Sequence, residues 1–237
     1  MDMPLDDPLA AAAVNAIHSG DAKSLQRLLA ENSNLVNARV DGERTLLHVA
    51  TDWPGHFPNN MDTVVTLVAH GADVNAAFAG RHSETPLHWA ASSDDIAVID
   101  VLLDHGANIE AQGGVVGGGA PLSDAVAFGQ WNAARRLVER GARTTLWQAA
   151  ALGLMVRVEE CFGVVPPPTV DEITNAFWCA CHGGQRAMAE FLLERGADLN
   201  WVGHDGHSPL DAANRSGAAE VVHWLRSQGA KSARTST

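Results

Sequence analysis

The chain has 237 residues, of which 46% are hydrophobic and 19% are charged, a composition typical of a folded protein and too apolar for a disordered one. Its net charge of −12 excludes the positive field that gathers nucleic acid or anionic lipid. The longest uncharged stretches have 13 residues, shorter than the roughly 20 that span a bilayer, so we expect neither nucleic acid nor a membrane as a partner.

The cysteines and the N-terminus indicate a compartment. The three cysteines are an odd number without a Cys-x-x-Cys pair, and Asp2, Asp6 and Asp7 stand where a secretory signal carries basic residues. Both features favour the reducing cytoplasm.

The first predicted element is a helix that begins after Asp7. Asp7 suits the N-cap, Pro8 suits the first helical position, and the alanine-rich run ends at Gly20. A second helix follows, with Leu25, Leu28 and Leu29 on one face.

From residue 45 onward this two-helix pattern recurs. Similar heptapeptides begin at Thr45, Thr85, Ala120, Asn175 and Ser208. A Gly-Ala dipeptide ends each unit, at Gly71, Gly106, Gly141, Gly196 and Gly229. Counting back seven, four and three positions from the first four of these glycines gives apolar residues, the spacing of one helix face. In the last unit the third of these positions is Arg226, as an outward-facing terminal repeat requires.

These strings, above all Thr85-Pro-Leu-His-Trp-Ala-Ala, resemble the ankyrin repeat, with its Thr-Pro-Leu-His-x-Ala signature and a period near 33. The resemblance implies an all-α solenoid of about seven helix-turn-helix repeats with short hairpin connections. We expect a single stack over residues 1–230 and a flexible C-terminal tail over 231–237. The expected repeats lie near 8–40, 41–80, 81–113, 114–143, 144–168, 169–203 and 204–230.

Several connections depart from the regular repeat. The connection from Gly141 to Thr144 is too short for a projecting hairpin, and three prolines at 166–168 enforce an extended segment before Thr169 or Asp171 caps a helix. The glycine-rich loop 113–119 and the insertion 53–60 have roles that the sequence leaves open. Trp53, His56 and Phe57 of this insertion either cover a neighbouring unit or lie free to bind a partner.

A candidate binding site follows from comparing equivalent positions across the repeats. In each repeat, the eighth and ninth residues counted from the start of the heptapeptide, or its equivalent, end the first helix on the concave side of such a stack. At these positions Trp53, Phe128 and Leu152 are apolar. They suggest an apolar groove with a polar rim, unless loops cover them as additional core. The predicted binding residues are His18, Asp52, Trp53, His56, Phe128, Leu152, His182 and Arg215.

No catalytic motif stands out, so the sequence favours a binding protein over an enzyme. His204-x-x-His207 lacks a third metal ligand, and neither a metal nor a cofactor is expected. The resemblance implies a protein-protein interaction or scaffold module whose partner binds the concave groove, and the acidic charge favours a neutral or basic partner. The alternative is a small-molecule binding protein or enzyme with an apolar pocket in this groove, lined by Trp, Phe and His and suited to an apolar ligand.

Overall fold

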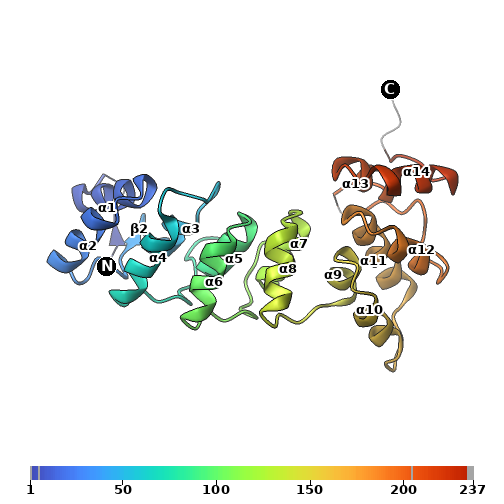
Figure 1. Ribbon diagram of the computed structural model, residues 1–237, viewed down its shortest axis with the longest axis horizontal. Coiled ribbons are helices and arrows are strands. Elements are labelled where there is room, and N and C mark those ends of the chain that lie inside the picture. Colours follow the sequence, from blue (N-terminus) through green and yellow to red (C-terminus); the bar gives the residue numbers. More distant parts are fainter. Residues whose placement is uncertain (1, 5, 204, 234–237) are drawn as a thin grey trace. The chain divides into compact units, whose positions relative to one another are not determined.

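The computed structural model describes residues 2–4, 6–203 and 205–233. Its internal contacts divide the chain into two compact units, the first ending at Ala142 and the second beginning at Arg143. Both units consist mainly of short antiparallel helix pairs (Figure 1), which confirms the predicted all-α repeat fold.

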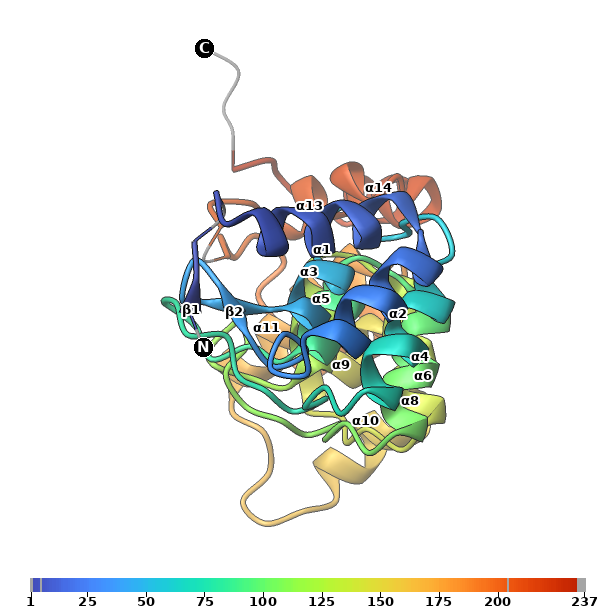
Figure 2. The ribbon, with the colours of Figure 1, turned by 90° about the vertical axis from the view of Figure 1, so that its left-hand side faces the viewer.

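The first unit contains α1 to α8 and three short strands. Their bounds are β1 Asp2–Met3, α1 Pro8–Ser19, α2 Ala22–Glu31, β2 Arg39–Val40, β3 Arg44–Thr45, α3 Leu46–Thr51, α4 Asn60–Ala69, α5 Pro86–Ser92, α6 Ile96–Asp104, α7 Pro121–Ala127 and α8 Trp131–Glu139. The helices pack in two rows (Figure 2): α1, α3, α5 and α7 follow one another in the first row and α2, α4, α6 and α8 in the second. We refer to these as the first and second helices of each pair.

The predicted apolar stripe of the second helices faces the core. Its fully buried members are Val64, Leu67, Ile99, Leu102, Ala134, Leu137, Ala189 and Leu192. Gly71, which follows α4, has a φ of 91°, and the glycines that end the later units are also left-handed, as a helix C-terminus of this kind requires. The second helices that these glycines follow therefore end where the sequence predicts.

Strands contribute little to the first unit, as expected. β2 and β3 form an antiparallel hairpin in which Arg39 pairs with Thr45, and β1 adds in parallel with Asp2 opposite Arg39. Met3 is buried here, so this N-terminal segment belongs to the packed structure.

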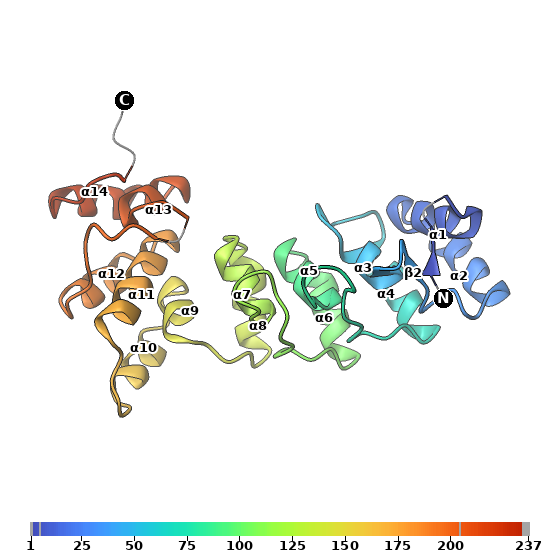
Figure 3. The same ribbon diagram turned by 180° about the vertical axis from the view of Figure 1, so that it is seen from behind.

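The second unit contains the six helices α9 to α14 (Figure 3). Their bounds are α9 Leu146–Ala151, α10 Met155–Phe162, α11 Val170–His182, α12 Arg186–Leu193, α13 Pro209–Arg215 and α14 Ala219–Ser227. Phe177, Leu192 and Leu225 lie in its hydrophobic core.

Two features of the second unit can be compared with expectation. α11 begins at Val170, because Thr169, one of the two caps expected after the prolines, forms a capping box with Glu172. At the other end, the backbone N–H of Lys231 donates to Asn200 and that of Ala233 donates to Asp211, so these residues of the expected flexible tail are held in place. Residues 234–237 lie outside the described part.

Candidate functional site

A pocket lies in the first unit where three successive first helices end. Asp52 caps α3, Ser93 caps α5 and Phe128 caps α7, so the repeat brings equivalent positions side by side. The volume is about 440 Å³, and the lining residues are Asp52, Trp53, Glu84, Trp89, Ser92, Ser93, Phe128 and Gln130. We call this the aromatic pocket.

Two of the pocket's aromatic side chains are open to solvent. Trp53 is 79% exposed and Phe128 is 49% exposed. Trp89 is half-buried, with its ring centroid 5.0 Å from that of His48 and 5.3 Å from that of Phe78. The pocket therefore has one fixed aromatic wall and two accessible ones.

The insertion between α3 and α4 projects beside the helices (Figure 3) and is fastened to both neighbouring helix pairs. On one side Phe57 stacks on His18 with 4.6 Å between ring centroids, and the Asn59 amide donates to the Gly20 carbonyl at 3.1 Å. On the other side His56 Nε2 lies 2.9 Å from the Ser93 carbonyl oxygen. Two of the three large side chains of this loop thus cover neighbouring repeats, while Trp53 stays exposed.

Gly55 makes the close approach of this loop possible. Its φ is 70°, and a Cβ at this position would lie 2.7 Å from the Cβ of Ser93. A larger residue would push the loop, and Trp53 with it, away from α5.

The pocket's two carboxylates lie in different surroundings. Arg44 Nη1 donates to Asp52 Oδ2 at 2.9 Å, so Asp52 has a cationic partner on the rim. Glu84 is buried, and this burial raises the pKa of its carboxyl group, as does the nearby charge of Asp124. A hydrogen bond from the Trp89 side chain has the opposite, smaller effect on this pKa.

The structure therefore brings together three of the predicted binding residues, Asp52, Trp53 and Phe128. His18 and His56 hold the insertion in place and do not line the aromatic pocket. Leu152, in the second unit, is only 7% exposed, which corrects the expectation of an open apolar point there: it is part of the packed interior.

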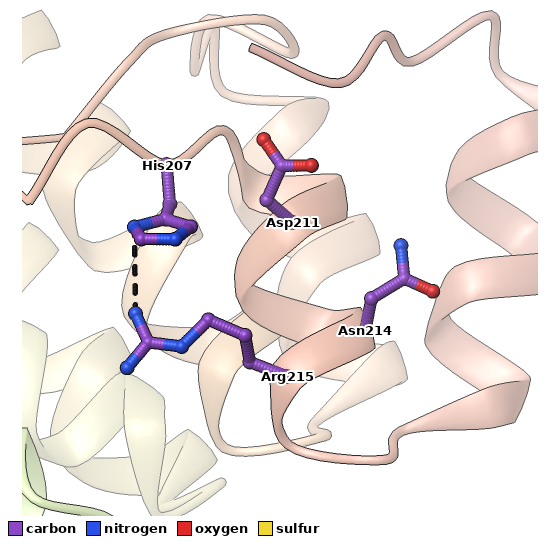
Figure 4. Close-up of a pocket in the computed structure, with 4 residues that line it drawn as sticks. All are labelled: His207, Asp211, Asn214 and Arg215. Carbon is purple, nitrogen blue, oxygen red and sulfur yellow. Dashed lines mark hydrogen bonds between the residues drawn. The ribbon is translucent and has the colours of Figure 1, made fainter. Parts of the chain in front are cut away.

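His182 and Arg215 belong to the second unit. The His182 ring lies 5.5 Å from that of Trp178, and its Nδ1 is 2.9 Å from Ser216 Oγ. Arg215 lines a polar hollow of about 520 Å³ together with His207, Asp211 and Asn214 (Figure 4). There Arg215 Nη1 donates to Asp205 Oδ2 at 3.0 Å and lies 3.4 Å from His207 Nδ1.

Asp211 is already engaged on one side of this hollow. Burial by itself would raise its pKa, but hydrogen bonds from Ser232, Ala233 and Ser208 outweigh burial and lower the pKa to about 2. The ionised Asp211 therefore holds the C-terminal segment in place.

Sequence reasoning missed Glu84, Trp89 and Gln130. Trp89 fills the variable position of the Thr-Pro-Leu-His-x-Ala signature, and Glu84 directly precedes that signature. The aromatic residue in the variable position and the acidic residue just before the signature were the features of the sequence that could have identified these two pocket residues.

The described residues contain no group of three or more His, Cys, Asp or Glu side chains arranged to hold a metal ion. His204 of the His204-x-x-His207 pair lies outside the described residues. Within the described chain, no helix combines the length and the apolar character that crossing a bilayer requires.

Consecutive helix pairs with short connections define a helical-repeat protein. The sequence matches the family described as "Ankyrin repeats (3 copies)" over residues 59–147 and 146–236, more than half of the chain. The chain therefore belongs to the ankyrin-repeat family, whose repeats generally mediate protein-protein interactions.

Curated relatives and a solved structure agree with this family. The putative palmitoyltransferase ZDHHC13 of Danio rerio is 26% identical over 76% of this chain and 29% of its own length. The serine/threonine-protein kinase VIK of Arabidopsis thaliana is 37% identical over 41% of this chain and 20% of its own length. The chain thus spans less than a third of these relatives. The crystal structure of the human ASB11 ankyrin repeat domain shares the fold, with 22% identity, a TM-score of 0.55 and coverage of 90% of this chain and 96% of that one.

Proposed function

We propose that this protein is an interaction module that binds a partner protein at the aromatic pocket and along the adjacent ends of the first helices. The observation that carries the proposal is the exposure of Trp53 and Phe128 on the same pocket. Large aromatic side chains are enriched at the centres of protein interfaces, where burying them contributes much of the binding energy.

The fastening of the insertion supports this proposal. His56 and Asn59 tie the loop to the helix pairs on either side, so Trp53 is presented from a fixed backbone. A preorganised anchor loses less conformational entropy on binding than one on a free loop. The net charge of −12 favours a neutral or basic partner.

A second candidate function is the binding of a small apolar molecule in the same pocket. The volume of about 440 Å³ lies within the range of small-molecule sites. The exposure of Trp53 and Phe128 favours the protein partner, because a small ligand would leave much of both rings in water.

Affinity capture from an extract of the source organism tests the proposal. We expect the full chain to retain a set of proteins that the double variant Trp53→Ala, Phe128→Ala loses. Val165→Ala is the matched control, since Val165 is 95% exposed in the second unit, and it should retain the same set as the unchanged chain.

The double variant should unfold at nearly the same temperature as the unchanged chain, because exposed side chains contribute little to stability. An unchanged set of captured proteins together with a lower unfolding temperature would mean that the two rings serve as packing. A small molecule released on denaturing the purified chain, and absent from the double variant, would favour the second candidate.

We also propose a cytoplasmic location. The free thiols of Cys161, Cys179 and Cys181 suit a reducing compartment. Fractionation of source cells, followed by detection of the native chain, tests this location.

A further inference from the structure

We propose that the aromatic pocket receives an arginine side chain of the partner protein. This inference rests on the proposed function and names the chemistry that the partner presents. The aromatic walls, the buried carboxylate and the hydrogen-bond acceptors of the pocket all suit this side chain.

Three aromatic rings favour a flat cation. The faces of Trp and Phe rings attract positive charge, and a guanidinium group also stacks on such faces. Trp89 is held against His48 and Phe78, whereas Trp53 and Phe128 are open to an incoming group. The fixed ring provides a stacking surface, and the open rings allow entry.

Glu84 supplies the countercharge. This side chain is only 8% exposed, and among the described residues no ion pair is made to its carboxylate. Asp52, in contrast, is already paired with Arg44 at the rim. A cation entering the pocket would therefore gain its strongest electrostatic interaction with Glu84, in surroundings that screen charge less than water does.

Hydrogen-bond acceptors distinguish arginine from a methylated ammonium group. Ser92 Oγ is buried and has no hydrogen-bond partner within the described structure. Gln130 donates its amide N–H to the Ser92 carbonyl at 2.8 Å, which leaves the amide oxygen of Gln130 as an acceptor. A guanidinium carries five N–H donors for such groups, whereas a trimethylated ammonium carries none.

The experiment uses the full chain with its tryptophan indoles labelled with 15N, titrated with the capped tripeptide acetyl-Gly-Arg-Gly-amide. Citrulline replaces arginine in the matched peptide, because it keeps the shape and loses the charge. Trimethyllysine replaces it in a third peptide. We expect saturable shifts of the Trp53 and Trp89 indole signals with the arginine peptide, and at least about tenfold weaker binding of the other two.

Variants test whether the arginine peptide binds in the aromatic pocket. Glu84→Gln should weaken binding of the arginine peptide about tenfold by removing one charge-assisted interaction, whereas Glu43→Gln, which removes an exposed carboxylate outside the pocket, should leave it unchanged. If Glu84→Gln fails to fold, Trp53→Ala serves instead, since its side chain is largely exposed and its loss should also weaken binding.

The inference is overturned if no indole signal saturates up to the solubility limit of the arginine peptide. It is equally overturned if the citrulline or trimethyllysine peptide binds as tightly as the arginine peptide. Capture of partner proteins that depends on Trp53 and Phe128 would still support the proposed function in either case. Loss of that dependence would instead reject the proposed function, so the two failures are distinguishable.

Discussion

His48 is a buried hydrogen-bonding residue rather than a catalytic one. Its Nδ1 accepts the backbone N–H of Thr45 at 3.3 Å, and its Nε2 lies 3.1 Å from the carbonyl oxygen of Glu84 in the next repeat. This arrangement requires the neutral ring with its proton on Nε2. Burial lowers the pKa of His48 from 6.5 to about 4.

This pKa shift predicts how stability depends on pH. The unfolded chain binds a proton at His48 more readily than the folded chain does. The stabilisation that the neutral His48 ring contributes to the folded state is therefore complete above about pH 6.5 and is lost as the pH falls toward 4. Within that window the free energy of unfolding should fall by up to about 1.4 kcal/mol per pH unit from this residue. Urea unfolding followed by circular dichroism between pH 7 and 4.5 measures the slope.

His48→Gln provides the control for this slope. Gln148 occupies the equivalent position of α9, where its Oε1 accepts the Thr145 N–H at 2.8 Å, so glutamine preserves the capping arrangement without a titrating ring. The variant should lose less stability on acidification. Parallel curves for the two proteins would show that His48 does not account for the loss.

The candidate site was only partly predictable at the scale of residues. Position in the repeat placed Trp53 and Phe128 at equivalent helix ends, because the repeat period fixes the direction in which each position points. It could not tell that Leu152, at an equivalent position, is buried, since exposure depends on what packs against each residue. Nor could it identify Glu84, whose surroundings are set by the neighbouring repeat.

Second helices of adjacent pairs are joined by a cluster of charges. Arg136 of α8 donates to Asp100 of α6 through Nε and Nη2, at 2.8 and 2.9 Å, and Arg140 Nη1 donates to the same carboxylate at 2.6 Å. Burial would raise the pKa of Asp100, but the hydrogen bonds from both arginines outweigh it, so the pKa is lowered.

Asp100→Asn should therefore destabilise the chain by about 1 kcal/mol, because it removes the charge on α6 that two guanidinium groups of α8 share. The loss should shrink at high salt. Glu160→Gln is the matched control, since within the described chain Glu160 makes its ion pair with Arg157 of the same helix, α10, and both side chains are well exposed. Urea unfolding at low and high salt compares the variants. An equal effect of the two substitutions would contradict a special role for the α6–α8 cluster.

Element boundaries were predictable where local chemistry determines them. Asp7 and Pro8 start α1, and left-handed glycines follow α4, α6, α8, α12 and α14, because caps and backbone freedom are local properties. The start of α11 was predictable for the same reason. Thr169, one of the two caps expected after the prolines, forms a capping box with Glu172, so the helix begins before the heptapeptide at Asn175.

At the scale of the whole molecule, repetition in the sequence predicts that each helix pair packs on its neighbours. It does not predict how strongly successive neighbours hold together, which depends on side-chain packing. The contacts divide the chain between Ala142 and Arg143, within the short connection that the sequence singled out. The seven repeat boundaries and the continuous stack stay predictions.

This division predicts that two truncations behave differently. A chain ending at Ala142 keeps α1 to α8 with the contacts of the first unit, so it should stay monomeric and unfold cooperatively in urea. A chain ending at Pro168 also keeps α9 and α10 but lacks α11, on which α9 packs. Ala149, Ala150 and Val158, all fully buried in the second unit's core, would then be exposed.

The longer fragment should therefore associate and bind a hydrophobic dye, although it contains more of the protein than the shorter one. Light scattering after size-exclusion chromatography measures the association of each fragment at equal concentration. A monomeric chain ending at Pro168 would mean that α9 and α10 bury their apolar faces without α11. Association of the chain ending at Ala142 would mean that the first unit depends on residues beyond its boundary. The longer fragment is predicted to associate more than the shorter one because of where each hydrophobic core is cut. A chain end between units exposes less apolar surface than a chain end within a unit.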